Sequence, residues 1–401
     1  MYLTPEEKAM LAGDLGPGVK RAMEIIVALG KIYGAQELVT VQSVQVAGVS
    51  YKNLGDAGVE FLQEWAEQGA RVRVPTTLNP AGMDLSHWRE LGISAEFAHK
   101  QIAVIGAFKA MGIISSCSCT PYLTGALPTL GQHIAWSESS AVSFANSVLG
   151  ARTNREGGPS ALAAAITGRT ARYGLHLDEH RRATHIVEVR CPVTSEADFG
   201  VLGYLVGRRV QNGVPYFKGL GDREQGMLKA LGAAMAASGA VALYHVEGVT
   251  PEARAGDVVA AEAETVLIDS LDEGYAALNS PVDEIDLVSI GCPHASLAEV
   301  EEVARWLEGK RVKAKLWITT AREIKERAQE QGLVELIEAA GGRVVADTCL
   351  VVAPIEALGL RSLATNSAKA AFYAPTHSGL MVRLGKLEQC LEAAVRGRWP
   401  G

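Results

Sequence analysis

The sequence predicts an α/β protein with mostly parallel sheets, and three observations carry this prediction. In the last third of the chain, short apolar strands alternate with amphipathic helices, the pattern of parallel sheets covered by helices. Glycine is frequent, with 42 residues, as expected where many tight turns connect short elements. The hydrophobic fraction of 48% and the charged fraction of 21% are those of an ordinary globular protein.

The N-terminal half begins with a helix and continues in strand–turn units. Thr4 and Glu7 form a capping box around Pro5, which suits the first helical position. Apolar periodicity and glycine stops predict further helices over 19–30, 56–69, 96–111, 137–149 and 160–168. Short apolar runs predict strands over 38–46, 71–74, 113–116 and 185–190.

The C-terminal half repeats the alternation more clearly. Strands are predicted over 240–246, 287–290, 314–318 and 343–346, and helices over 297–307, 322–340 and 387–395. No internal repeat or long linker divides the 401 residues, so we expect one catalytic-sized body with soft internal lobes of roughly 1–190, 191–280 and 281–401.

Charge and hydropathy narrow the classes of function. The net charge of -7 argues against binding nucleic acid through bulk electrostatics. The longest apolar stretch, Ala230 to Tyr244, is shorter than the ~20 residues that a membrane-spanning helix needs. Without a secretory pattern at the N-terminus, we expect a cytoplasmic protein with no membrane association, in which the six cysteines stay reduced.

Three cysteines follow predicted strands at the positions where α/β proteins bind ligands. Cys119, Cys292 and Cys349 each come one to three residues after a short apolar strand. Ligand sites gather beyond the carboxyl ends of parallel strands, so distant thiols can converge there. Thiolates select zinc or iron–sulfur clusters, and three protein ligands leave one metal position open for Lewis-acid chemistry.

The spacing of these cysteines leaves other interpretations open. Buried free cysteine is common as a small apolar residue, and the chain has no Cys-x-x-Cys pair. Cys191 also follows a strand, and Cys117 could replace Cys119 as a ligand. Cys390 lies in a predicted helix, where packing is its expected role.

Several charged residues allow a functional and a structural interpretation. Lys369 lies at a helix start, where an ammonium and a helix N-terminus together favour an anion, although a solvated lysine is the commoner case. Arg152 and Arg155 could clamp a phosphate or carboxylate, or could anchor their loop through Glu156. Glu138 could orient a hydroxyl or assist proton transfer, or could be a first-turn carboxylate in a helix capped by Ser137.

Seven segments, taken together and in order, resemble the aconitase X family, in particular its archaeal large subunits. They are 47–53 (AGVSYKN), 76–80 (TTLNP), 119–122 (CTPY), 133–141, 150–159 (GARTNREGGP), 291–294 (GCPH) and 347–349 (DTC). The resemblance implies an aconitase-like catalytic body of several α/β lobes without the swivelling domain. It also implies an iron–sulfur cluster, [4Fe-4S] by expectation, on Cys119, Cys292 and Cys349. The substrate-binding positions that it implies are Gly48, Val49, Ser50, Asn79, Pro80, Glu138, Ser139 and Lys369.

The resemblance also implies an activity and a partner. The expected reaction is a dehydration by a hydro-lyase, from (R)-5-phosphomevalonate to trans-anhydromevalonate 5-phosphate in the archaeal mevalonate pathway. Because the sequence ends at Gly401 without a swivelling domain, we expect a separate small subunit, in a heterodimer or heterotetramer, that carries the catalytic base. The alternatives are a cis-3-hydroxyproline dehydratase of the same family and a metal-free α/β binding or scaffold protein.

Overall fold

Two separate parallel sheets lie at the centre of the computed structural model, which describes residues 1–221 and 223–400. One has the strand order β3-β2-β4 and the other the order β12-β11-β10-β13-β14, and every neighbouring pair in both is parallel. A third sheet, β8-β7-β6-β9, is parallel as well, and β1 pairs antiparallel with β5. The predicted fold class, α/β with mostly parallel sheets, is confirmed.

The first third of the chain supplies the smaller central sheet and its helices. Its elements are α1 (Pro5–Ala12), α2 (Pro17–Ile32), β1 (Leu38–Thr40), β2 (Val44–Val46), α3 (Tyr51–Glu67), β3 (Thr76–Leu78), α4 (Ala95–Ala110), β4 (Ala135–Trp136), α5 (Ser139–Ser147), α6 (Gly158–Thr167) and β5 (Arg169–Ala171). The capping box of α1 forms as predicted, with Thr4 and Glu7 each bonding the other's backbone N–H.

The middle of the chain forms a sheet with two long helices on it. Its elements are β6 (Ala183–Val189), α7 (Glu196–Val210), β7 (Pro215–Lys218), α8 (Gln225–Gly239), β8 (His245–Val246), α9 (Pro251–Ala255), β9 (Val259–Ile268) and α10 (Asp272–Leu278). Glycines let α7 and α8 pack at backbone distance: a Cβ on Gly239 would lie 1.9 Å from the carbonyl oxygen of Gly207. The shared core of these helices includes Phe199, Leu202 and Leu231.

The last third forms the larger parallel sheet. Its elements are β10 (Leu287–Ala295), α11 (Leu297–Leu307), β11 (Lys315–Thr320), α12 (Arg322–Glu330), α13 (Leu333–Ala339), β12 (Arg343–Ala346), β13 (Ser362–Thr365), α14 (Ala368–Ser378), β14 (Met381–Leu384) and α15 (Leu387–Arg396). The chain moves outward from β10 to β12 and then returns to β13 on the other side of β10. A small cavity lies at this reversal, lined by Cys292 of β10 and by Asn366 and Ser367 after β13, where α/β folds typically bind ligands.

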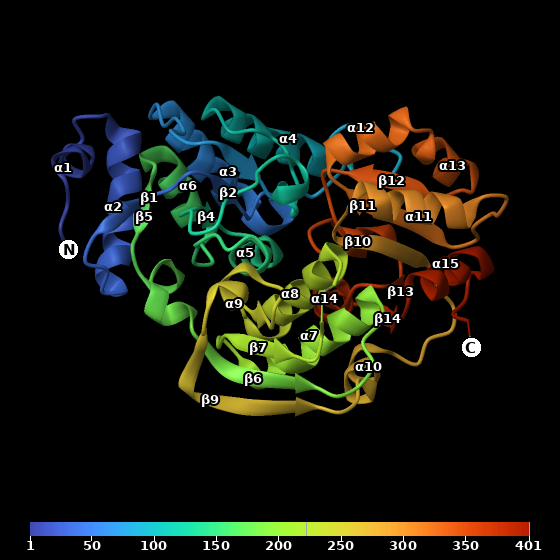
Figure 1. Ribbon diagram of the computed structural model, residues 1–401. Helices are drawn as coiled ribbons and strands as arrows, with labels where there is room; N and C mark the ends of the chain where they lie inside the picture. The colour runs from blue at the N-terminus through green and yellow to red at the C-terminus, as the bar shows by residue number, and fades with distance from the viewer. Residues whose placement is uncertain (222, 401) are drawn as a thin grey trace.

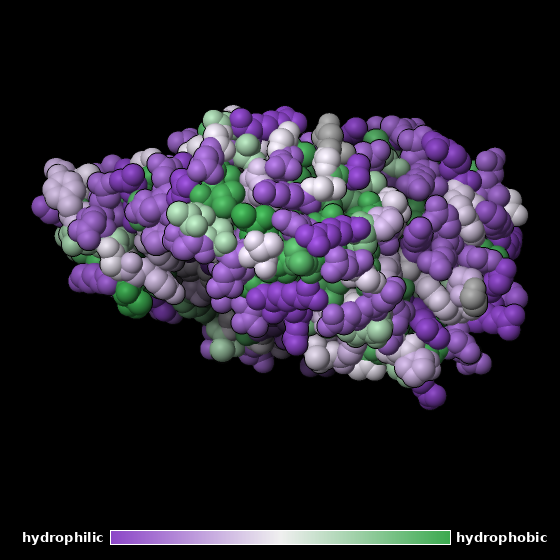
Figure 2. Space-filling model, turned by 60° about the horizontal axis from the view of Figure 1, so that its bottom comes forward, coloured by the Kyte–Doolittle hydropathy of each residue, from purple (hydrophilic) through white to green (hydrophobic). Residues whose placement is uncertain are grey.

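Figure 1 shows how these parts are arranged. Helices α1 to α6 (blue to green) lie at the N-terminal end, α11 to α13 (orange) cover the larger sheet at the other end, and the β6–β9 sheet runs along the bottom. The surface turned forward in Figure 2 shows small hydrophobic patches separated by hydrophilic side chains. Edge strand β9 carries exposed Glu262 and Glu264, and such charges discourage pairing with another chain.

Five predicted elements differ from the structure. Residues 71–74 form no strand; the strand β3 begins after Pro75 instead. The stretch 113–116 contributes only an isolated bridge at Ile114. The predicted strand 38–46 is two strands, because β1 and β2 pair in different sheets, and 240–246 is a strand only at its last two residues. The predicted helix 322–340 is divided at Gly332, whose φ of 74° is left-handed.

No helix in the part of the chain that the structure describes is long and apolar enough to span a bilayer.

Candidate active site

The predicted site residues lie just beyond the carboxyl ends of the strands in the two central sheets. β2 leads into Gly48, Val49 and Ser50, and β3 leads into Asn79 and Pro80. β4 leads into Glu138 and Ser139, β12 into Cys349, and β13 into Lys369, while Cys292 lies within the last four residues of β10. Contacts join the two sets: Ala81 after β3 bridges to Thr348 after β12, and the His294 N–H lies 3.2 Å from the Cys119 Sγ.

Lys369 and Glu138 form a buried ion pair between the two sheets. The Lys369 Nζ lies 2.5 Å from the Glu138 Oε1 and 3.2 Å from the Ser140 hydroxyl, and both charged side chains are less than 10% exposed. Burial alone would raise the pKa of Glu138, but Lys369 and hydrogen bonds from Ser140 and the Ala141 N–H hold it below its usual value. Burial lowers the pKa of Lys369, but the charges of Glu138, Cys292 and Cys119 and the hydrogen bond with Glu138 together raise it above its usual value. Both groups are therefore charged at neutral pH.

Glu138 is the N-cap of α5, which corrects the predicted cap. Its carboxylate accepts a 2.7 Å hydrogen bond from the Ala141 N–H and a 2.6 Å bond from the Ser140 hydroxyl. We expected Ser137 in this place, but the Ser137 hydroxyl bonds the carbonyl oxygen of Gly157 instead. The carboxylate is thus fixed by the helix end and by Lys369 together.

The structure brings Cys119, Cys292 and Cys349 into one electrostatic neighbourhood. Burial raises the pKa of each thiol, to about 12 for Cys349. Cys349 interacts electrostatically with both other thiols: Cys349 raises the pKa of Cys119, and Cys292 raises the pKa of Cys349. Lys369 acts in the opposite direction on all three. The ammonium of Lys369 therefore acts electrostatically on all three thiols.

The other cysteines have different surroundings. Cys117 is buried beside Asp347 and Arg322, Cys191 faces Asp269 and Asp198, and the Cys390 thiol is within α15. Within residues 1–221 and 223–400, no three His, Cys, Asp or Glu side chains are close enough to hold a single metal ion.

His294 links all three cysteine segments, and sequence reasoning had given it no role. Its Nε2 lies 2.9 Å from the carbonyl oxygen of Thr348, next to Cys349, and its Nδ1 lies 3.2 Å from the Ser118 hydroxyl, next to Cys119. Because a carbonyl only accepts, Nε2 carries the proton and Nδ1 accepts from Ser118. Burial lowers the pKa of His294 to about 4, so the ring is neutral. The signal in the sequence was its place two residues after Cys292.

Two buried glutamines fix the loops that follow the strands, and sequence reasoning missed both. Gln101 of α4 accepts from the Tyr51 and Gly82 N–H groups and donates to the Val49 carbonyl oxygen, which ties the 48–51 turn to the 79–82 turn. Gln45 of β2 donates to the Ser118 carbonyl oxygen and accepts from the Glu138 N–H. A polar residue inside a three-residue buried strand was the available signal.

Several buried polar atoms in this region have no partner among the described residues. They are the Asn79 Oδ1, the Tyr122 hydroxyl and the Thr348 hydroxyl. Tyr122 interacts electrostatically with Cys119 and Glu138, so it borders the thiols. Buried polar groups are nearly always hydrogen-bonded, and a cluster of exceptions is typical of a site that takes a ligand.

A second ion pair, between buried Lys229 and partly buried Glu299, lies near Cys292. The Lys229 Nζ is 2.8 and 2.6 Å from the two oxygens of Glu299, and a small cavity lined by both also contacts Cys292 and Glu196. That cavity shares residues with a larger one of about 450 Å³ at the N-termini of α7, α8 and α11. Sequence reasoning missed Lys229, although a lone lysine in the alanine-rich helix α8 was a visible signal.

Arg152 and Arg155 do not act as a pair. Arg152 forms an ion pair with Asp178 and donates to the His176 carbonyl oxygen, so it anchors its loop, and Arg155 is exposed. The predicted partner was wrong, because Glu156 is buried and accepts hydrogen bonds from Ser160 and Thr170 instead.

Comparison with known proteins identifies the family. The aconitase X first, second and third domain models match residues 1–179, 183–275 and 285–396. The phosphomevalonate dehydratase large subunits of Methanocaldococcus jannaschii and Thermococcus kodakarensis are each 52% identical, over 98% of this chain and all of theirs. The cis-3-hydroxy-L-proline dehydratase of Pseudomonas aeruginosa is 38% identical, over 98% of this chain and 70% of its own length.

A solved structure agrees with these matches. The crystal structure of holo-form aconitase X from Thermococcus kodakaraensis superposes with a TM-score of 0.92 at 51% identity, and the match covers 98% of this chain and 100% of that one. Identity of this level over nearly the full length leaves the fold and the family without ambiguity. The chain belongs to the aconitase X family.

Proposed function

We propose that the chain is the catalytic large subunit of a hydro-lyase that converts (R)-5-phosphomevalonate into trans-anhydromevalonate 5-phosphate. The observation that carries the proposal is that Lys369, in a buried ion pair with Glu138, acts electrostatically on all three thiols near the carboxyl ends of two parallel sheets. Similarity supports the substrate. Relatives at 52% identity carry the name phosphomevalonate dehydratase large subunit, whereas the hydroxyproline dehydratase is 38% identical and longer.

The residues at this place fit an iron–sulfur cluster, which we propose to be [4Fe-4S]. Sulfur donors favour such clusters, and in a cluster each thiolate binds its own iron, so the sulfur atoms surround a cage and do not meet at one ion. Cys119, Cys292 and Cys349 would hold three irons, which leaves one without a protein ligand. When bound, the cluster supplies a Lewis acid for the carboxylate and the C3 hydroxyl of the substrate, which weakens the carbon–oxygen bond.

Lys369 and Asn79 are suited to hold and orient the substrate. An ammonium has three N–H donors, and Glu138 and Ser140 accept two of those of Lys369, which leaves one for an anionic group. Lys369 also lies in the first turn of α14, where the helix dipole favours anions. The unpartnered Oδ1 of Asn79 accepts a substrate hydroxyl, and Gly48, Val49, Ser50, Pro80 and Ser139 complete the wall.

The catalytic base is better placed on another chain than on Glu138. Dehydration requires removal of a proton from C2, and the Glu138 carboxylate already accepts from Lys369, Ser140, Ser139 and the Ala141 N–H. These bonds stabilise the charged form and lower its pKa, so it is a weak base. Glu138 therefore orients Lys369. We assign the base to a small-subunit partner, in line with the name "large subunit" of the relatives.

The experiment that tests this function is an assay of the reconstituted complex. The chain is co-expressed with a small-subunit gene, purified without oxygen and supplied with 5-phosphomevalonate or cis-3-hydroxyproline in parallel. We expect dehydration of 5-phosphomevalonate only, and low activity of the large subunit alone. Turnover of hydroxyproline alone would reject the substrate, and a complex without iron or activity would favour a scaffold role.

A further inference from the structure

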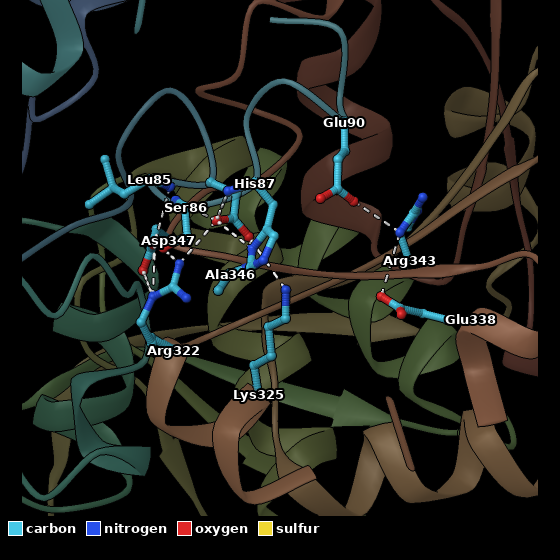
Figure 3. A network of polar contacts seen from close by, with 11 residues as sticks. Leu85, Ser86, His87, Glu90, Arg322, Lys325, Glu338, Arg343, Ala346 and Asp347 are labelled. Atoms are coloured by element: carbon cyan, nitrogen blue, oxygen red, sulfur yellow. Dashed lines mark hydrogen bonds and ion pairs between the residues drawn. The ribbon is translucent and has the colours of Figure 1, made fainter. Parts of the chain in front are cut away.

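A network of charged groups joins the regions matched by the first and third domain models. Figure 3 shows Arg322 beside Asp347, with Lys325 and the backbone of residues 85–87 close by. Asp84 belongs to residues 1–179, whereas Arg322, Lys325 and Asp347 belong to residues 285–396. Both carboxylates are 1% exposed, so the network is buried on its acidic side.

Arg322 bonds both carboxylates at once. Its Nη2 lies 3.0 Å from the Asp84 Oδ1 and also contacts the Asp347 Oδ2, while its Nε lies 3.2 Å from both Asp347 oxygens. Lys325 adds a second cation 3.6 Å from the Asp84 Oδ2. Two carboxylates and two cations balance, and a planar guanidinium is the side chain suited to such a two-pronged contact.

The two cations stand where the local helix disfavours them. Arg322 is the first residue of α12 and Lys325 lies in the same turn, at the positive end of the helix dipole. Asp84 and Asp347, which come from outside the helix, compensate this unfavourable position. Cations that are kept at a helix N-terminus against its dipole indicate that Arg322 and Lys325 stand there for their contacts with other parts of the fold.

The same carboxylates fix the backbone on both sides of the candidate active site. Asp84 accepts from the N–H groups of Ser86, His87 and Ala346, and Asp347 accepts from the Leu85 N–H. The Ala81 N–H bonds the Asp347 carbonyl oxygen at 2.8 Å, and Asp347 has a left-handed φ of 63°. The turn that follows Asn79–Pro80 is thereby held against the turn that leads into Cys349.

We propose that Arg322 is a positioning residue whose clamp on Asp84 and Asp347 sets the register between the Asn79–Pro80 turn and Cys349. The need for it follows from the division of the site, since Cys119 and Asn79 come from one domain and Cys292 and Cys349 from another. The effects of Arg322 on cluster retention and substrate binding rest on the proposed function. The effect of Arg322 on the order of the backbone in the two turns is independent of that function.

The test compares Arg322→Met and Arg322→Lys with a matched control, Arg343→Met. Arg343 also joins the two domains, through an ion pair with Glu90 at 3.1 Å, and it pairs with Glu338 of its own domain at 3.8 Å. It is 48% exposed, and both of these carboxylates lie outside the two turns. Three quantities are measured on the full chain, purified anaerobically: amide hydrogen exchange of residues 81–87 and 346–350, the rate of iron loss to a chelator, and KM and kcat with the small subunit.

For Arg322→Met we expect exchange in both turns to rise about tenfold, iron loss to accelerate by a similar factor, and KM to rise more than kcat falls. Arg322→Lys should recover part of each effect, and Arg343→Met should match the wild type within about twofold. Equal exchange in Arg322→Met and Arg343→Met would overturn the clamp. If Arg322→Met does not fold, Asp84→Asn is measured instead, and unchanged exchange there would overturn it as well. A wild type without iron would reject the proposed function, while the exchange result would still decide the clamp.

Discussion

At the scale of single residues, the buried pair of Lys369 and Glu138 is the most consequential contact. Both side chains are less than 10% exposed and their charged atoms are 2.5 Å apart. Removing one partner leaves the other charge buried and unpaired, which costs about 3–5 kcal/mol in other proteins.

Lys369→Met should therefore lower the free energy of unfolding by about 3 kcal/mol and abolish dehydration. Lys100→Met is the matched control, because Lys100 and Asp56 are also 2.5 Å apart but are 43% and 63% exposed, and its effect should stay below about 1 kcal/mol. Urea denaturation of both variants measures the difference. Equal effects would mean that burial does not decide the strength of the Lys369 pair.

Glu196 gives a pH dependence whose sign follows from its surroundings. Burial and the charge of Glu299 raise the pKa of Glu196 to about 7, against the opposing effect of Lys229. The folded chain therefore keeps this proton at pH values where the unfolded chain, with a carboxyl pKa of 4.5, has lost it. The stability that the folded chain gains by keeping this proton is fully present below pH 4.5 and is lost as the pH rises toward 7.

Glu196→Gln should thus gain stability relative to the wild type as the pH rises from 5 to 8, by on the order of 1–2 kcal/mol. Denaturation of the apo chain at several pH values measures this gap. Glu388→Gln, which removes an exposed carboxylate from the same cavity, is the control. A gap that does not change with pH would contradict a protonated Glu196.

The sequence could predict site residues only where a local pattern marks them. Cys119, Cys292 and Cys349 follow short apolar runs, Glu138 and Lys369 stand at predicted helix starts, and the resemblance chose among the cysteines. The roles assigned to the substrate positions stay predictions. Lys229, Gln101 and Gln45 were missed because each lies inside a helix or strand, where its partner comes from a distant segment that sequence periodicity does not reveal.

At the scale of elements, the packing of α7 on α8 depends on glycine. These helices meet through Gly203, Gly207 and Gly239, and a side chain at any of them would strike backbone or neighbouring atoms of the other helix. They also support the site, because α8 carries Lys229 and contacts both α5 and α14.

Gly239→Ala should destabilise the chain by about 1–3 kcal/mol, because its Cβ would lie 1.9 Å from the backbone oxygen of Gly207, and relieving this overlap would require the backbone of a packed helix to shift. Gly106→Ala is the control, since it lies in α4 with open space around it, and it should stabilise the chain by about 0.5–1 kcal/mol. Thermal and urea unfolding measure both variants. If Gly239→Ala left the free energy of unfolding unchanged, the close packing of α7 on α8 would not be needed for stability.

Helices were easier to predict than strands in this chain. Capping boxes and apolar periodicity located α1, α4 and α11 closely. β2, β3 and β4 have three, three and two residues, too few for an alternating pattern, and their pairing comes from distant parts of the chain. The same reason explains why 71–74 was taken for a strand and the strand at 76–78 was not predicted.

At the scale of the whole molecule, the account depends on two parallel sheets that direct their carboxyl ends toward each other. The alternation in the sequence predicted parallel sheets, but it could not predict that they form separate sheets or that Ala81 would pair with Thr348. Such contacts between distant segments arise from tertiary packing. The predicted lobe boundaries stay a prediction.

The central claim is that thiols from two domains hold one iron–sulfur cluster. The most direct test is the iron and acid-labile sulfide content of the anaerobically purified chain, with its visible absorbance, for Cys119→Ser, Cys292→Ser, Cys349→Ser and, as a control, Cys390→Ser. We predict iron and sulfide in the wild type and in Cys390→Ser, and a loss or strong reduction of both in each of the other three. A wild type without iron, or three variants that keep the full content, would contradict the account.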